Sequence, residues 1–264
     1  MRPTELYSVT MLTRDALEDS SLYAAWIQHC TEEGGVVLVD KGKDWTSFDV
    51  VAKLRGMTRI KKIGHAGTLD PLATGLLIVC LGKMTKSING FQEQTKAYRA
   101  VVKLGATTKT DDAEAPEENS VSLELLTNEK IRDVAQSFLG EIAQIPPMFS
   151  AIKKNGVPLY KMARKGQEIE REARHVRIEA ITTESIVLPY CTLHITCSKG
   201  TYIRSLARDI GAALGVGGYL ADLRRTSIGS YSVNDALTID EISQLHSLFR
   251  PQTPLQTHSS STIS

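Results

Sequence analysis

Apolar runs of strand length recur along most of the chain. The segments Val36–Val39 and Leu76–Leu81 are almost wholly apolar and rich in branched side chains, which is typical of buried strands. More mixed strand patterns follow at Tyr98–Leu104, Val176–Ile181, Thr192–Ser198 and Gly229–Val233. Their succession favours hairpins over crossover connections, and therefore a mostly antiparallel sheet.

Helical patterns separate these strands. A short helix is predicted at Leu22–Ile27, a second after Ser47, a third at Leu125–Phe138 and a fourth at Tyr202–Leu214. Ser47 and Thr201 are the predicted N-caps of the second and fourth helices, because a hydroxyl can accept a hydrogen bond from the first turn. The apolar stripe of the fourth helix is expected to be core. Helices and strands in this order predict an α+β protein.

The regular pattern suggests one main domain with two appendages. Residues 1–33 precede the first clear strand and are interpreted as an N-terminal extension. Residues 34–250 form the main domain, in which residues 153–177 are a basic insertion. Residues 251–264 contain two prolines and no Asp, Glu, Lys or Arg, and are predicted to be a disordered tail. Residues 110–120, with five acidic side chains and Pro116, are predicted to be a solvated excursion.

The formal net charge of +1 conceals a segregation of charge along the sequence. Residues 41–110 hold 13 Lys or Arg against 4 Asp or Glu, whereas residues 111–142 hold 2 against 9. A local positive surplus suits a polyanionic partner such as nucleic acid, because binding releases the counterions that phosphates condense. A charged surface that is merely solvated is the alternative.

Other classes of protein find little support. Cys30, Cys80, Cys191 and Cys197 show no Cys-x-x-Cys spacing, so neither a zinc site nor disulfides are expected. No secretory leader and no membrane-spanning run is recognised, which favours a cytoplasmic location and no membrane partner.

The richest motif is the run Gly64-His65-Ala66-Gly67-Thr68-Leu69-Asp70-Pro71-Leu72-Ala73-Thr74-Gly75-Leu76-Leu77. Its glycines permit unusual backbone conformations, and Pro71 fixes the turn after a single carboxylate. From spacing alone, an Asp-Pro pair is more often a simple turn than a catalytic site. The whole run, however, resembles the signature of the tRNA pseudouridine synthase B (TruB) family, in which the aspartate is the catalytic residue.

Further segments carry the resemblance, which extends over residues 35–235. They are Lys96-Ala97-Tyr98-Arg99-Ala100, Pro146-Pro147-Met148-Phe149-Ser150-Ala151-Ile152-Lys153, Ser198-Lys199-Gly200-Thr201-Tyr202-Ile203-Arg204-Ser205-Leu206-Ala207-Arg208-Asp209, and Gly218-Tyr219-Leu220-Ala221-Asp222-Leu223-Arg224-Arg225-Thr226. Gly42 departs from the pattern, since a proline usually follows the Asp40-Lys41 pair. The chain after Ile239 is too short for the PUA-type RNA-binding domain of many relatives, so no full PUA domain is expected.

The resemblance implies a fold, a reaction and a substrate. The fold would be that of pseudouridine synthases, with a central, mixed, mostly antiparallel sheet flanked by helices. The reaction would convert the T-loop uridine of tRNA, position 55, to pseudouridine after base flipping. No cofactor, metal or guide RNA is expected, and the stand-alone bacterial type with a monomeric chain is favoured. A carboxylate can attack C1′ or the pyrimidine ring, or assist a glycal intermediate, and these routes stay open.

The same resemblance implies roles for individual residues. Asp70, Tyr98 and Arg204 are the catalytic candidates. Arg204 is expected to pair with Asp70 and lower its pKa, and Tyr98 is expected to stack on the flipped uracil. His65, Lys86, Tyr202 and Leu223 are the candidates for substrate binding. The predicted contacts to the RNA backbone are the basic residues Lys53, Arg55, Arg59, Lys61, Lys62, Lys153, Lys154, Arg164 and Lys165.

Competing functions lack their partner residues. Gly82-Lys83-Met84-Thr85 does not have the spacing of a phosphate-binding P-loop, and residues 215–220 do not match a dinucleotide fingerprint. Glycoside hydrolysis would require a second carboxylate paired with Asp70. A non-catalytic RNA-folding factor that uses the same basic surfaces remains the alternative from another class.

Overall fold

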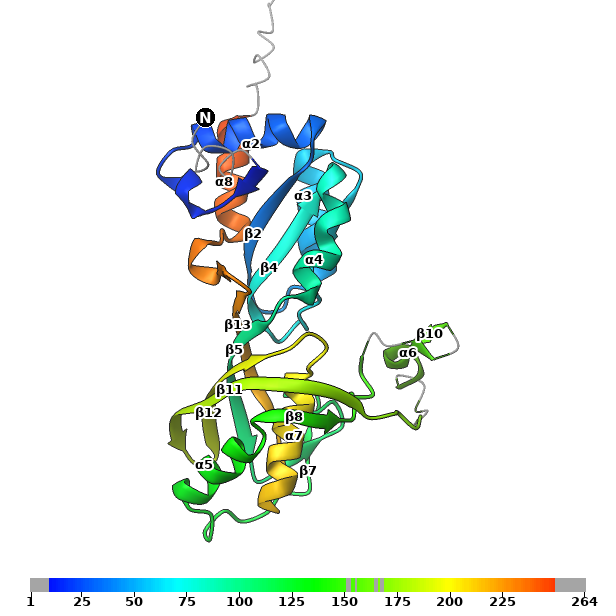
Figure 1. The fold of residues 1–264 in the computed structure, drawn as a ribbon, viewed down its shortest axis with the longest axis vertical. Helices are drawn as coiled ribbons and strands as arrows, with labels where there is room; N and C mark the ends of the chain where they lie inside the picture. Colours follow the sequence, from blue (N-terminus) through cyan, green and yellow to red (C-terminus); the bar gives the residue numbers. More distant parts are fainter. Residues whose placement is uncertain (1–9, 151–152, 155, 164–165, 167–168, 250–264) are drawn as a thin grey trace, which may run out of the picture.

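The fold is built on one large twisted sheet. A computed structural model describes residues 10–150, 153–154, 156–163, 166 and 169–249. Within these residues, ten strands form a sheet with the order β1-β2-β4-β13-β5-β12-β11-β8, and β3 and β14 pair with β4 and β13 (Figure 1). Only the pairs β1–β2 and β4–β13 are parallel. The predicted α+β fold with a mixed, mostly antiparallel sheet is confirmed.

The strands of this sheet and the helices around it have the following bounds. The strands are β1 (Met11–Leu12), β2 (Gly35–Lys41), β3 (Ile63–His65), β4 (Thr74–Leu81), β5 (Lys96–Leu104), β8 (Gly140–Gln144), β11 (Arg174–Val187), β12 (Tyr190–Cys197), β13 (Gly218–Ile228) and β14 (Tyr231–Ser232). The helices are η1 (Arg14–Leu17), α2 (Ser21–Glu32), α3 (Ser47–Thr58), η2 (Gly82–Ser87), α4 (Ile88–Glu93), α5 (Asn128–Ser137), α6 (Leu159–Ala163), α7 (Ile203–Leu214), η3 (Val233–Asp235) and α8 (Ile239–Leu248). Two small hairpins, β6 (Thr107–Thr108) with β7 (Glu117–Glu118) and β9 (Lys153–Lys154) with β10 (Val157–Pro158), complete the described elements.

Strands β2 and β4 are buried on both faces. Alternate side chains of the two strands, such as Leu77 and Ile78, belong to separate hydrophobic clusters on opposite sides of the sheet. Residues of α2, α3 and α8 complete one cluster, and Phe91 of α4 and Ile228 belong to the other. Burial on both faces explains why these strands are continuous apolar runs in the sequence.

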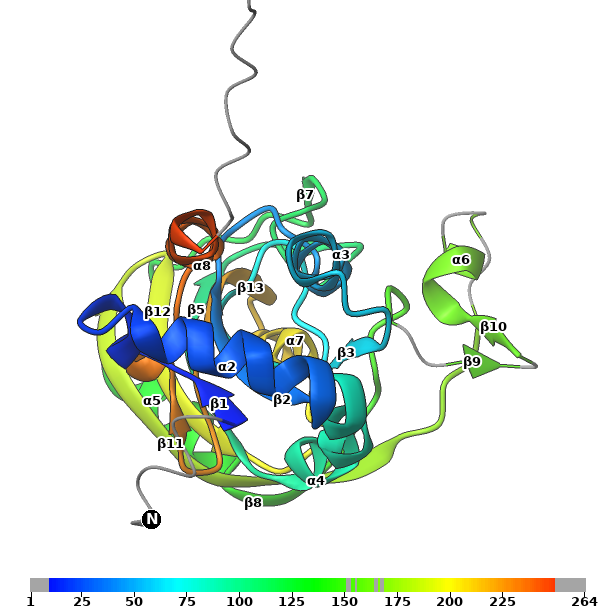
Figure 2. The same cartoon turned by 90° about the horizontal axis from the view of Figure 1, so that it is seen from above.

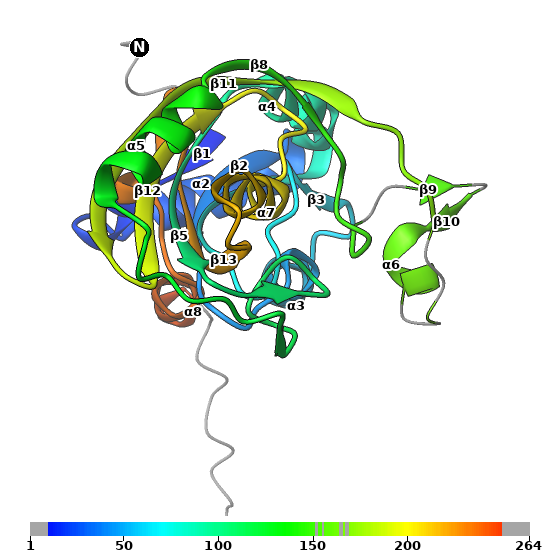
Figure 3. The same ribbon diagram turned by 90° about the horizontal axis from the view of Figure 1, so that it is seen from below.

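The other half of the sheet curves around a helix. Figure 3 shows α7 lying inside the curve formed by β5, β12, β11 and β8. The apolar stripe of α7 joins residues of β5, β12 and α5 in the largest hydrophobic cluster, as its helical spacing predicts. Strands β5 and β13 run from one half to the other and connect them (Figure 1).

The N-terminal residues that the structure describes belong to the packed fold. Strand β1 pairs with β2, and α2 buries Tyr23 and Trp26 completely. The boundary at residue 33 thus marks the start of the regular strand pattern and not the start of the fold. The basic insertion projects from the body as the β9–β10 hairpin and α6 (Figure 2). The tail predicted at 251–264 lies outside the described residues. None of the described helices has the length and apolar character to cross a membrane.

Strand β13 is the main element that the sequence did not predict. Its charged residues, such as Arg224 and Arg225, interrupt the apolar pattern, although β13 lies between β4 and β5. The strand predicted at Gly229–Val233 is only the two-residue β14 after the turn. Strand β8 was missed as well, and helix α5 begins at Asn128, where the hydroxyl of Thr127 caps it.

Gly75 provides a test of how closely β4 and β13 approach. Its φ is +102°, and a Cβ added there would lie 2.2 Å from the carbonyl oxygen of Arg225. Gly75→Ala is therefore expected to lower the free energy of unfolding by about 3 kcal/mol or more, from backbone strain and overpacking. Gly56→Ala is the matched control, since nothing lies within 4 Å of a Cβ there. In mid-helix that change should stabilise by up to about 1 kcal/mol. Chemical denaturation measures the free energy of unfolding of each variant. Equal changes in the two variants would contradict the interpretation that Gly75 is required by the close approach of β4 and β13.

Candidate active site

One large cleft gathers most of the predicted site residues. Its volume is about 970 Å³, and its lining comes from the loop after β3, the start of α3, β5, the segment before α7, and β13. The structure brings together six of the seven catalytic and substrate-binding candidates, namely His65, Asp70, Tyr98, Tyr202, Arg204 and Leu223. The seventh, Lys86, is exposed on η2 and does not line the cleft.

The loop that carries Asp70 is held by the start of α3. The Ser47 hydroxyl accepts a hydrogen bond from the Leu69 N–H (2.9 Å) and donates one to the Leu69 carbonyl (3.2 Å). The prediction that Ser47 caps the helix is therefore wrong. Thr46 is the N-cap, in a reciprocal capping box with Asp49. The buried Ser47 side chain instead fixes the residue before the catalytic candidate.

Lys41 supports the same loop from within the protein. Its side chain is completely buried, and its Nζ donates to the carbonyls of Trp45 (2.6 Å), Gly42 (3.0 Å) and Pro71 (3.4 Å). Because Pro71 follows Asp70, these bonds tie the turn to the end of β2. Burial lowers the pKa of Lys41 to about 8, while the nearby Asp70 acts in the opposite direction.

Arg225 of β13 holds the other side of the loop. Its buried guanidinium donates to the Leu76 carbonyl (2.7 Å) and to the Gly67 carbonyl (3.1 Å). Burial raises the pKa of the neighbouring Tyr98, and Arg225 opposes that rise. Burial and the charge of Arg225 both lower the pKa of His65. Arg225 lies in a segment that matches the family, but its role was not predicted, because its partners are backbone carbonyls 149 and 158 residues away.

Arg204 lies at the centre of the polar contacts in the cleft. Its Nε lies 2.9 Å from Oδ2 of Asp70, as an ion pair whose N–H is not aligned for a hydrogen bond. Its Nη1 lies 3.3 Å from Oδ2 of Asp112. The guanidinium also donates to the carbonyls of Thr110 (3.1 Å) and Phe149 (2.8 Å). The arginine is thus buried and multiply anchored, and it is not a surface residue of α7.

Asp112 corrects the interpretation of residues 110–120 as a solvated excursion. Its side chain is buried beside Arg204, and its Oδ1 accepts hydrogen bonds from the Thr110 hydroxyl and the Glu114 N–H. The preceding Asp111 pairs with Arg208 of α7 (2.8 Å). The start of the acidic segment therefore packs over α7, because two arginines of that helix need partners inside the protein.

Tyr202 is positioned through its backbone. The buried side chain of Gln144, at the end of β8, accepts a hydrogen bond from the Tyr202 N–H (2.8 Å) and donates one to the Tyr202 carbonyl (3.1 Å). Tyr202 is the residue before α7, and its side chain makes no capping bond. The prediction that Thr201 caps α7 is wrong, since the Thr201 hydroxyl donates to the Ser198 carbonyl instead.

The surroundings of Asp70 act on its pKa in opposite directions. Burial is the largest influence and raises the pKa of Asp70, and the charge of Asp112 adds to the rise. Arg204 lowers the pKa, as expected, and so does Lys41, but they only partly offset burial. The expected effect of Arg204 is therefore confirmed, while the pKa of Asp70 as a whole is raised by burial. A carboxyl group with a raised pKa binds its proton more tightly in the folded protein than in the unfolded chain.

This shift predicts opposite pH dependences for activity and stability. If the carboxylate form acts, the single-turnover rate should fall as the pH drops through a pKa above the ordinary 3.8 of Asp. The contribution of Asp70 to stability has the reverse sign: it is present below the unfolded pKa and is lost as the pH rises through the folded one. Asp70→Asn should therefore gain stability relative to the native protein across this window. The single-turnover rate and the thermal unfolding temperature are measured from pH 3.5 to 8. A rate that falls only at a pH of 3.8 or below would contradict the prediction.

The predicted RNA-backbone residues of α3 and of the loop after it do not line the cleft. Lys53, Arg59, Lys61 and Lys62 are exposed on α3 and on the loop that follows it. Arg55 is half-buried, and its Nε donates to the Lys61 carbonyl (3.3 Å). The backbone of Lys153 and Lys154 forms β9, whereas Arg164 and Lys165 lie outside the described residues. The lining of the cleft contributes its own exposed cations, Arg174 and Lys199, and the buried Lys96.

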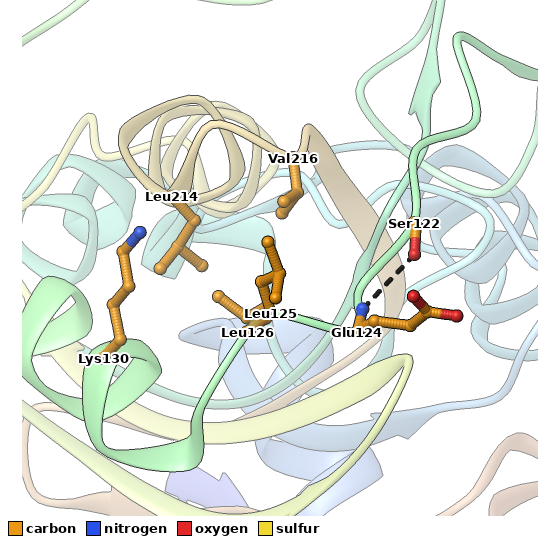
Figure 4. Close-up of a pocket in the computed structure, with 7 residues that line it drawn as sticks. All are labelled: Ser122, Glu124, Leu125, Leu126, Lys130, Leu214 and Val216. Carbon is orange, nitrogen blue, oxygen red and sulfur yellow. Dashed lines mark hydrogen bonds between the residues drawn. The ribbon is translucent and has the colours of Figure 1, made fainter.

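A smaller pocket lies at the far end of α7. Figure 4 shows Leu125, Leu126, Leu214 and Val216 around it, with Lys130 and Glu124 at its edge. It contains none of the candidate residues and has no acid paired with a buried base. The chemistry of the chain is therefore concentrated in the large cleft.

The fold and the cleft together define a pseudouridine synthase. Two related solved assemblies have similar chains: a Cbf5–Nop10–Gar1 complex (31% sequence identity, TM-score 0.62) and an H/ACA RNP bound to a substrate RNA containing 2′-deoxyuridine (28%, 0.60). Each match covers 81% of this chain, but only 56% of the chain in the first assembly and 53% of the chain in the second. The chain thus spans little more than half the length of these structures.

Sequence comparisons identify the family. The model of the TruB family pseudouridylate synthase N-terminal domain matches residues 55–203, and that of the tRNA pseudouridylate synthase B C-terminal domain matches residues 204–256. The chain belongs to the TruB family of pseudouridylate synthases. The tRNA pseudouridine synthase B of Chlorobium chlorochromatii is 47% identical over 83% of this chain and 88% of that protein. The protein of the same name from Geobacter sulfurreducens is 46% identical, and the match covers 80% of this chain and 69% of that protein.

Proposed function

We propose that this chain converts uridine to pseudouridine in tRNA, at the T-loop uridine of position 55. The observation that carries the proposal is the arrangement around Asp70. The carboxylate lies in a cleft of nucleotide size, on a loop held by Ser47, Lys41 and Arg225, and it is paired with the buried Arg204. This arrangement occurs in a member of the TruB family, whose curated relatives are named tRNA pseudouridine synthase B.

The reaction requires no exchange of electrons with another molecule. The bond between C1′ and N1 of the uridine breaks, the uracil turns, and a bond forms between C1′ and C5. The hydrogen on C5 leaves as a proton, and N1, which has lost its bond to C1′, takes up a proton in the product. The electrons therefore balance within the substrate, and the residues of the cleft are sufficient in kind to carry acid–base and nucleophilic steps.

Each cleft residue has a role in this proposal. Asp70 acts on the glycosidic bond, and Arg204 holds the carboxylate in place and stabilises its charged form. Tyr98 stacks on the flipped uracil, and Leu223 forms an apolar wall beside it. His65 occupies the space that the flipped base leaves, and Tyr202 contacts the substrate from the start of α7. Lys86 has no place in this arrangement, because it lies on η2 outside the cleft.

The proposal includes action on tRNA without a guide RNA. Support comes from the high identity to tRNA pseudouridine synthase B over about 80% of the chain, against the partial overlap with the chains of the H/ACA assemblies. The exposed cations on α3 and the loop after it would bind the phosphates of the T-arm. A tRNA-folding factor without turnover would use the same cations, but it would have no need for the paired Asp70 and Arg204.

The deciding experiment is release of tritium from tRNA labelled at C5 of uridine. The native protein should release tritium from an unmodified transcript, and it should release none when the T-loop uridine is replaced by cytidine. Release from other uridines would overturn the choice of target while keeping the reaction. Tight binding without any release would overturn the enzymatic function and favour the folding factor.

A further inference from the structure

An exposed aromatic side chain stands at the mouth of the cleft. Phe48, the second residue of α3, is 68% exposed although it lines the cleft. The next apolar residues of the same helix, Val50, Val51 and Leu54, are buried in the hydrophobic core. None of the ring pairs among the described residues includes Phe48. Most of its surface is therefore open to solvent, and no other ring of the described residues covers it.

A lone exposed apolar residue is ordinary, and only its position distinguishes this one. Phe48 follows Ser47, the residue whose hydroxyl makes both hydrogen bonds to the backbone of Leu69. Leu69 in turn precedes Asp70. The ring of Phe48 is thus fixed to the same support as the catalytic carboxylate, and it projects from the cleft lining at the start of a rigid, capped helix.

The surroundings of Phe48 are suited to a polyanion. The helix that carries Phe48 and the loop after it bear four exposed cations, which are Lys53, Arg59, Lys61 and Lys62. The one acid in the first turn of α3, Asp49, is engaged in the capping box with Thr46. An aromatic face beside a row of cations is the usual platform for single-stranded nucleic acid, in which bases stack and phosphates contact the cations.

We propose that Phe48 is a stacking platform for an unpaired base of the substrate RNA, next to the flipped uridine. The inference rests on the proposed function, because it supplies the loop in which such a base lies. Phe48 takes no part in bond breaking. It is a positioning residue that holds the neighbouring nucleotide while the uridine turns into the cleft. Its contribution therefore lies in substrate binding, and the rate of the bound complex is unaffected.

The test compares the binding of an unmodified tRNA transcript to four variants. Phe48→Ala and Phe48→Leu should both weaken binding by about tenfold, because stacking on one ring contributes on that order. Phe48→Trp should retain the affinity, since it keeps a π face. Leu248→Ala is the matched control: Leu248 is also 68% exposed, but it lies on α8 and does not line the cleft. The single-turnover rate at saturating protein should be the same for all four variants and the native chain.

Transcripts with a single abasic nucleotide identify the stacked base. Each loop nucleotide other than the target is replaced in turn, and at one of them Phe48→Ala should cause no further loss of affinity. Equal affinity of Phe48→Leu and the native protein would overturn the proposal, as would the same tenfold loss on every abasic transcript. Either result leaves the proposed function intact if the native protein still isomerises the transcript. Absence of isomerisation by the native protein would instead be the failure of the proposed function.

Discussion

Asp70→Asn is expected to abolish pseudouridine formation and to leave tRNA binding within about twofold. The substitution keeps the size of the side chain but removes the charge and the nucleophilic oxygen. Enzymes that lose the residue attacking the substrate lose about 10⁴-fold or more in rate. The fold should tolerate the change, because burial already disfavours the charged carboxyl and Arg204 keeps Asp112 as an ion-pair partner.

The measurement is single-turnover tritium release together with filter binding of the same transcript. Glu118→Gln is the matched control, since it removes one exposed carboxylate that does not line the cleft. That variant should have the native rate. A rate for Asp70→Asn within tenfold of native would mean that another group attacks the substrate. Loss of binding as well as rate would assign Asp70 a role in holding the RNA.

The sequence identified the cleft residues that lie within recognisable motifs. Asp70, Tyr98 and Arg204 are far apart in the chain, and their motifs could be recognised one at a time. The structure then places them in one cleft because β4, β13 and β5 are neighbours in the sheet and α7, which carries Arg204, packs against β13. Their roles in the reaction remain predictions that the proposed experiments test.

The supporting residues could not be predicted in the same way. Lys41 and Arg225 lie in segments that match the family, but they act on backbone carbonyls, which every residue possesses, so the sequence does not reveal which groups they hold. Asp112 lies in a segment whose acidic composition favours solvent, and only its buried contact with Arg204 explains its place. Strand β13 was hidden for a related reason, since Arg225 is buried against a carbonyl that is remote in sequence, and Arg224 pairs with the equally remote Asp40.

The pKa of Asp70 also depends on the whole fold. An arginine beside a carboxylate lowers its pKa, and this local effect was predicted correctly. The opposing effect of burial comes from elements on both sides of the cleft, and its size follows only from their assembled packing. Lys86 illustrates the converse, because a matching local context did not bring its side chain to the cleft.

Arg204→Lys is expected to lower the single-turnover rate by about 10²- to 10³-fold, the range typical for loss of one preorganised electrostatic contact. A lysine is a single point charge, whereas the guanidinium joins Asp70, Asp112 and two backbone carbonyls at once. Arg204→Met removes the charge entirely and leaves Asp112 buried without its cation. That variant should also lose about 3–5 kcal/mol of stability, the usual effect of breaking a buried ion pair.

The pH dependence of the methionine variant separates the two functions of Arg204. Because its positive charge lowers the pKa of Asp70, its removal should move the acid limb of the rate profile to higher pH. Arg208→Lys is the matched control on the same helix, since Arg208 pairs with Asp111 and Asp209 and does not line the cleft. It should keep the native rate and acid limb. A native rate for Arg204→Lys would show that charge alone suffices. An unmoved acid limb for Arg204→Met would show that the ion pair with Asp70 does not set the protonation of the carboxyl group during the reaction.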